Sequence, residues 1–128
     1  MQESGENYLE TILLLKERNG SVRSIDIANE LGYAKPSVSR AVGILKKDGL
    51  IVVDSGGLIE LTEAGQQKAD SIYERHRMIS EYLVQTLHID EVTAEADACR
   101  IEHVISGETF DKIKAYVEKY RKMFQIDS

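Results

Sequence analysis

The segment spanning residues 24–61 constrains the fold most, because it places two short helical patterns before a strand hairpin. The first pattern predicts a helix over residues 25–31, which Gly32 ends. The second predicts a helix over residues 36–48, with Pro36 favoured in its first turn. Two short helices joined by so tight a turn are typical of a helix-turn-helix.

The residues after the second helix predict a β-hairpin. Two β-branched runs, residues 50–53 and 58–61, flank the turn sequence Asp-Ser-Gly-Gly. A hairpin that directly follows a helix-turn-helix makes a winged helix. The turn carries Asp54, so the wing is at best weakly basic, and the backbone amides of residues 55–57 are what it offers to a phosphate or to a minor groove.

The rest of the chain predicts further helices. Apolar spacing predicts them over residues 6–18, 63–87 and roughly 93–105, and a last one carries apolar residues from Phe110 to Phe124. Thr62 is the expected N-cap of the long helix. The predicted fold is therefore mainly α: a winged helix-turn-helix DNA-binding domain over residues 1–62 and a helical domain over residues 63–128.

The charge distribution fits a nucleic-acid partner better than the total charge does. The chain of 128 residues carries a net charge of −6, but residues 16–48 hold seven basic and four acidic side chains. This local excess governs contact with phosphates. Nothing resembles a signal peptide or a membrane span, and Cys99 is the only cysteine, so we expect a cytoplasmic protein without an internal disulfide.

The helix over residues 36–48 has one apolar stripe and one polar face. The opposite face is expected to meet DNA. The stripe consists of Val38, Ala41, Val42 and Leu45. Arginine can bond a guanine edge, serine can bond bases or phosphates, and lysine can pair with phosphates. The expected DNA-binding residues are Lys35, Pro36, Ser37, Ser39, Arg40 and Lys47. Charged faces of this kind are often simply solvated, and the surrounding motif is what favours DNA.

Cys99, Glu102 and His103 form the most distinctive chemical pattern in the chain. Spaced at i, i+3 and i+4, they share one face of a helix, and their sulfur, oxygen and nitrogen donors suit transition metals better than Mg²⁺ or Ca²⁺. Each of them alone is more often structural than a ligand. Asn7 and Glu10, one turn apart, and His76 are further candidates, but the sequence alone does not show that these segments converge.

The chain resembles the DtxR/MntR family of metal-dependent transcriptional repressors over about residues 5–125. The segments that carry the resemblance are Glu6–Ile12, Pro36–Ser39, Asp48–Leu50, Leu61–Gly65, Arg75–Arg77 and Ala98–His103, of which the last is the most specific. The resemblance implies a homodimer that binds a palindromic double-stranded DNA operator under control of Fe(II) or Mn(II). It implies metal ligands at Asn7, Glu10, His76, Cys99, Glu102 and His103.

The chain follows neither branch of that family fully. The iron-type branch usually has methionine and cysteine where this chain has Asn7 and Cys99, and the manganese-type branch has aspartate and glutamate. Ser80 and Glu95 stand where the iron-type branch has a glutamate and a histidine, so the resemblance does not carry over the second iron-type site. Because the given sequence stops after the sixth predicted helix, we expect a short form of the family without the SH3-like domain of longer members. The sequence therefore leaves the choice between iron and manganese open.

Two other functions compete with this interpretation. One is a winged-helix regulator in which the metal-like pattern is plain structure. The other is a carboxylate-bridged di-iron enzyme, which would need paired Glu-x-x-His motifs on facing helices, and the sequence has none. We therefore expect no enzyme activity, no organic substrate and no membrane partner. The dimer contact is expected to use apolar residues after position 100, with intramolecular packing as the alternative: Ile101, Val104, Ile105, Phe110 and Ile113.

Overall fold

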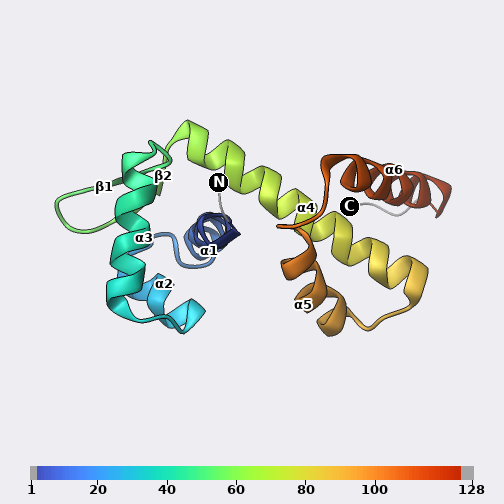
Figure 1. The fold of residues 1–128 in the computed structure, drawn as a ribbon, viewed down its shortest axis with the longest axis horizontal. Coiled ribbons are helices and arrows are strands. Elements are labelled where there is room, and N and C mark those ends of the chain that lie inside the picture. The colour runs from blue at the N-terminus through green and yellow to red at the C-terminus, as the bar shows by residue number, and fades with distance from the viewer. Residues whose placement is uncertain (1–2, 125–128) are drawn as a thin grey trace. The chain divides into compact units, whose positions relative to one another are not determined.

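The computed structural model describes residues 3–124, which form two compact units over residues 1–71 and 72–128. Each unit is described by itself. The elements are α1 (Glu3–Asn19), α2 (Ser24–Leu31), α3 (Lys35–Lys47), β1 (Ile51–Val53), β2 (Ile59–Leu61), α4 (Glu63–Leu87), α5 (Glu91–Ile101) and α6 (Gly107–Phe124). Helix α4 begins in the first unit and continues through the second (Figure 1). The predicted helical fold class is confirmed.

The N-terminal unit is built around α1. Leu9 and Ile12 of α1 are almost completely buried, and α1 contacts α2, α3 and β2. Burying each such side chain stabilises the unit by about 1.5–3 kcal/mol. Gly32 ends α2 in the left-handed conformation (φ 69°), and three residues later α3 begins. The predicted helix-turn-helix is therefore present.

The wing is a two-stranded antiparallel sheet in which Ile51 pairs with Leu61 and Val53 with Ile59. Two hydrogen bonds of Thr62 fix the connection from β2 to α4. Oγ1 of Thr62 accepts a hydrogen bond from the N–H of Gly65 at 3.1 Å, as expected for an N-cap, and it also donates to the carbonyl of Gly49 at 2.7 Å. Thr62 therefore connects the residue that precedes the wing, Gly49, to the first turn of α4.

The C-terminal unit has its own apolar core between α4, α5 and α6. Met78 and Ile79 of α4 pack with Ala98 of α5 and with Phe110 and Val117 of α6. Figure 1 shows α5 and α6 beside the second half of α4. Three further residues expected at the dimer contact pack against this core: Ile101, Ile105 and Ile113. With Phe110 they belong to the chain's own interior, and Val104 is the member of the expected set that is exposed (76%).

Helix α5 is shorter than predicted. Asp90 caps its start, and the hydrogen bond from the N–H of Thr93 lowers the pKa of the Asp90 carboxyl. The helix ends at Ile101 rather than near Ile105, and the N–H groups of His103 and Val104 bond carbonyls only three residues back. The physical reason is that Ser106 caps the next helix: its Oγ accepts a hydrogen bond from the N–H of Thr109 at 3.1 Å, so the chain turns over residues 102–106 before α6 begins. In residues 3–124 no helix is long and apolar enough to cross a membrane.

Candidate metal centre and nucleic-acid interface

Helix α3 presents the predicted face to solvent. Val38, Val42 and Leu45 are buried against the N-terminal unit, whereas Arg40 and Lys47 are exposed. The other expected DNA-binding residues are also exposed: Lys35, Pro36, Ser37 and Ser39. The outward face therefore offers one guanidinium, hydroxyls and lysines, with no acidic side chain within α3.

A shallow groove of about 270 Å³ lies beside the start of this helix. Its walls include Ser24 and Ile25 from α2 and Lys35, Val38 and Ser39 from α3. One lysine and two serines therefore surround a space at the mouth of the helix-turn-helix. Side chains of these types bond phosphate oxygens and thereby set the position of a protein on DNA.

The wing tip differs from the expectation that its amides are free for DNA. Oδ1 of Asp54 accepts hydrogen bonds from the N–H groups of Gly56 (2.8 Å) and Leu58 (2.9 Å), and the N–H of Gly57 bonds the carbonyl of Asp54. The carboxylate is therefore used inside the turn. The guanidinium of Arg23 donates to the carbonyl of Gly56. The wing thus offers this arginine at its tip, rather than the amides of Gly56 and Gly57.

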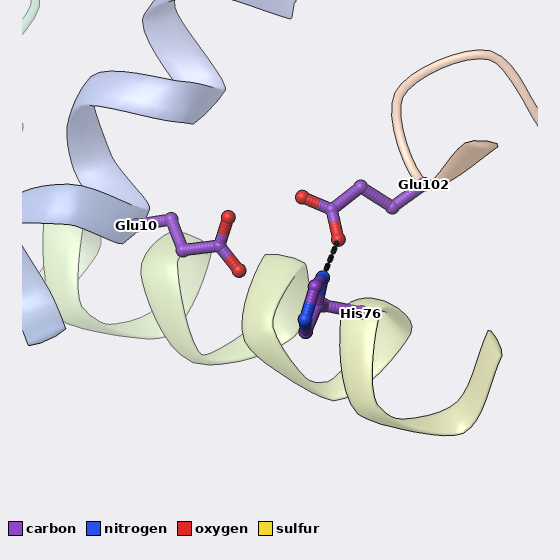
Figure 2. Close-up of side chains that lie close together, drawn as sticks. All are labelled: Glu10, His76 and Glu102. Carbon is purple, nitrogen blue, oxygen red and sulfur yellow. Dashed lines mark hydrogen bonds and ion pairs between the residues drawn. The ribbon is translucent and has the colours of Figure 1, made fainter. Parts of the chain in front are cut away.

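The candidate metal centre of the C-terminal unit is built on the Glu102 carboxylate. Glu102 follows α5 directly and is 1% exposed. Its Oε2 lies 3.0 Å from Nδ1 of His76 on α4, as Figure 2 shows, and its Oε1 lies 3.2 Å from Nε2 of His103. Two imidazoles therefore face one buried acidic group.

This carboxylate is incompletely satisfied. Although His103 is near, no donor in the described part of the chain is directed at Oε1 of Glu102 with hydrogen-bond geometry. A buried charge with an unfilled acceptor is costly unless a cation compensates it. Nitrogen and oxygen donors of this kind suit Fe(II), Mn(II) or Zn(II). The residues present therefore fit a divalent metal.

The other predicted ligands occupy different places. Cys99 is exposed on the last turn of α5. His103 contacts Glu102, but among the described residues neither Cys99 nor His103 clusters with both His76 and Glu102. Asn7 and Glu10 lie one turn apart on α1, in the N-terminal unit, where Glu10 is 8% exposed. The ring of Tyr73 stacks on that of His76, with centroids 6.5 Å apart. The roles of the six residues as ligands stay predictions.

Comparison with known families assigns both parts of the chain. Residues 1–57 match the N-terminal DNA-binding domain of the iron-dependent repressors, and residues 62–124 match the metal-binding and dimerisation domain of the same proteins. Together these matches cover nearly all of the chain. The chain belongs to the DtxR/MntR family of iron-dependent repressors. It is thus related to metal-dependent, DNA-binding transcriptional regulators and not to an enzyme family.

Individual relatives show how the family varies in length. An uncharacterised helix-turn-helix regulator of Methanocaldococcus jannaschii is 34% identical over 94% of this chain and 98% of its own length. The diphtheria toxin repressor of Corynebacterium diphtheriae is 33% identical over 83% of this chain but only 47% of its own. The chain therefore spans about half the length of that repressor, and nearly the full length of the archaeal relative.

Solved structures of manganese regulators have the same fold. The manganese regulator SloR is 28% identical, with a TM-score of 0.73 over 96% of this chain and 54% of its own. A manganese-dependent transcriptional repressor in complex with manganese is 25% identical, with a TM-score of 0.81 over 89% of this chain and 52% of its own. Iron and manganese regulators are thus both among the relatives.

The sequence did not predict two arginine contacts near the candidate sites. Arg23 reaches the wing tip from the start of α2, and Arg75 reaches the turn after Glu102 from α4. Each contact joins positions about 30 residues apart, so no local spacing could have indicated it.

Proposed function

We propose that this iron-dependent repressor family member is a metal-activated transcriptional repressor that binds its operator as a homodimer and controls Fe or Mn homeostasis. The buried Glu102 carboxylate, flanked by His76 and His103 and left with an unfilled acceptor, is the observation that carries the proposal. Because operator DNA is where such a protein acts, we place it in the cytoplasm. Residues 1–62 read the DNA, and residues 63–128 bind metal and dimerise.

The proposed ligands come from α1, from α4, and from the last turn of α5 with the two residues that follow it: Asn7, Glu10, His76, Cys99, Glu102 and His103. When bound, a divalent ion supplies two positive charges and a coordination sphere that oxygen, nitrogen and sulfur donors can share. Before binding, the carboxylates of Glu10 and Glu102 repel one another if they approach. The ligands of α1 therefore join those of the C-terminal unit only when this charge is compensated.

The consequence for DNA follows from how α1 is packed. Helix α1 contacts α2, α3 and β2, so the helix-turn-helix and the wing move with it. When metal coordination fixes α1, the packing of α1 on α3 also fixes the recognition helix α3 of each protomer. Palindromic operators need two recognition helices about 34–36 Å apart, one turn of DNA. Engagement of Asn7 and Glu10 thereby selects the DNA-competent arrangement.

The decisive experiment measures DNA binding by fluorescence anisotropy, using a labelled duplex from the region upstream of the protein's own gene. Titrations with chelator, with Mn(II) and with Fe(II) under anaerobic conditions are compared at one salt concentration. We expect tight binding only with metal. Equal affinity in chelator would overturn the proposal and favour a winged-helix regulator that senses another signal.

Glu102→Gln tests the metal centre, because it keeps the shape of the side chain and removes its charge. We expect metal affinity and metal-stimulated DNA binding to fall together, while circular dichroism shows an intact fold. Glu108→Gln, the same change at an exposed position in the first turn of α6, is the matched control and should leave both unchanged. Unchanged metal affinity in Glu102→Gln would remove Glu102 from the site.

Arg40→Ala tests the DNA face independently. Loss of a bidentate contact to a base costs about 1–3 kcal/mol, so operator affinity should fall roughly 10- to 100-fold. Metal affinity, measured by calorimetry on the same variant, should not change. If Arg40→Ala instead abolished metal binding, the assignment of the two sites would be wrong.

A further inference from the structure

The proposed ligands Glu102 and His103 lie outside any helix. Helix α5 ends at Ile101, and α6 begins only at Gly107. Within the turn, the N–H of His103 reaches the carbonyl of Arg100 at 3.4 Å, whereas the N–H groups of Val104 and Ile105 bond the carbonyl of Ile101 at 3.1 and 3.0 Å. These bonds join the turn to the end of α5 but not to α4, which carries His76, so a contact from α4 to the turn helps to set the distance between the proposed ligands.

Arg75 contacts this turn from α4. Its guanidinium donates a hydrogen bond to the carbonyl of Ile105 at 3.4 Å. The same guanidinium lies over the ring of Phe110 in the first turns of α6, 5.5 Å from the ring centroid. Because a guanidinium is planar, it can stack on a ring with its face while its edge donates hydrogen bonds. Arg75 therefore holds both the end of the turn and the start of the helix that follows.

Arg75 lies next to a proposed metal ligand in the sequence. Arg75 directly precedes His76, whose Nδ1 bonds Glu102. Two adjacent residues of α4 therefore have linked roles: His76 is a proposed ligand, and Arg75 contacts the turn that carries the proposed ligands Glu102 and His103. Phe110 belongs to the core of the C-terminal unit, and Ile105 packs against that core.

We propose that Arg75 is a positioning residue of the metal centre, which holds the Glu102–His103 turn at the distance from His76 that a divalent ion requires. This inference rests on the proposed function, because it assumes that these residues bind metal. Groups that orient metal ligands from outside typically change metal affinity about 10- to 100-fold when they are removed. We expect Arg75→Ala to weaken Mn(II) binding by a factor in that range.

The sign of the effect separates positioning from simple electrostatics. A cation next to a dication site opposes metal binding, so loss of its charge alone would strengthen affinity. A loss of affinity in Arg75→Ala therefore indicates positioning. Arg75→Lys keeps the charge but has no planar fork, so we expect it to recover only part of the lost affinity.

A second arginine of the same unit supplies the matched control. Arg121 of α6 pairs with Glu81 of α4, so Arg121→Ala also removes a tie between α4 and α6. Both alanine variants should lower thermal stability in chelator. Only Arg75→Ala should lower metal affinity, because the contact of Arg121 does not involve the Glu102–His103 turn.

The experiment is a direct Mn(II) titration by isothermal calorimetry of the wild-type protein and the three variants, with unfolding in chelator measured in parallel. Wild-type affinity in Arg75→Ala, or an equal loss in Arg121→Ala, would overturn the role of Arg75. Absence of Mn(II) and Fe(II) binding in the wild-type protein would instead overturn the proposed function, so the two failures are distinguishable.

Discussion

Replacement of Gly65 by alanine should destabilise the N-terminal unit severely. A Cβ built at this position would lie 1.9 Å from the carbonyl oxygen of Leu50 and 2.9 Å from its carbonyl carbon. Real Cβ atoms essentially never approach another heavy atom closer than 3.0 Å, so the first turn of α4 would have to move by about 1 Å. The obstacle is backbone, which cannot rotate away as a side chain can.

The size of the effect follows from what that movement breaks. Overpacking costs about 1–3 kcal/mol even where side chains can yield. The same shift disturbs the N-cap bond of Thr62 to Gly65, and loss of a cap costs about 0.5–2 kcal/mol. The higher helix propensity of alanine than of glycine offsets about 1 kcal/mol of this destabilisation. We therefore expect a net loss of about 3 kcal/mol, a large part of the 5–15 kcal/mol that stabilises a typical domain.

Urea unfolding at one protein concentration and in chelator measures this, because dimerisation and metal would otherwise contribute to stability. With a urea dependence of about 2 kcal/mol per molar, the midpoint should fall by about 1.5 M. Gly43→Ala is the matched control. Its Cβ would meet nothing within 4 Å in the interior of α3, so it should raise stability by about 0.5–1 kcal/mol. If both variants were stabilised alike, the close approach of α4 to Leu50 would be wrong.

Three further predictions concern DNA, metal and pH. Lys47→Ala should weaken binding to all DNA sequences about equally and reduce the slope of log affinity against log salt by about 0.9, because one phosphate contact is lost; an unchanged slope would remove Lys47 from the phosphate contacts. Saturating Mn(II) should raise the melting temperature of the wild-type protein but not of Glu102→Gln, and an equal rise in both would place the metal elsewhere. Asp90→Ala should lower the melting temperature at neutral pH, since the cap of α5 is lost. Because folding lowers the pKa of Asp90, its contribution is present above the usual value of 3.8 and disappears as the pH falls through the lowered value, so a difference between the two proteins that persists in strong acid would contradict the assignment.

Local chemistry in the sequence was sufficient to predict the architecture. Glycine after the last apolar residue ended α2, Pro36 began α3 in its first turn, and Thr62 capped α4, because each of these effects depends on residues within one turn of the chain. The apolar stripe of α3 also followed from helical spacing, and it left Arg40 and Lys47 exposed as predicted. The predicted hairpin is also present, as the antiparallel strands β1 and β2.

Only the tertiary structure decided the contacts between distant segments. The sequence placed Cys99, Glu102 and His103 on one helix, but α5 ends before Glu102, which turns toward His76 while Cys99 is exposed. Phe110, expected at a dimer contact, lies in the core of the C-terminal unit, and Ile105 packs against that core. Periodicity identifies which side chains leave water, but not which partner covers them. That choice, like the reach of Arg75 to a carbonyl 30 residues away, depends on the packing of whole helices.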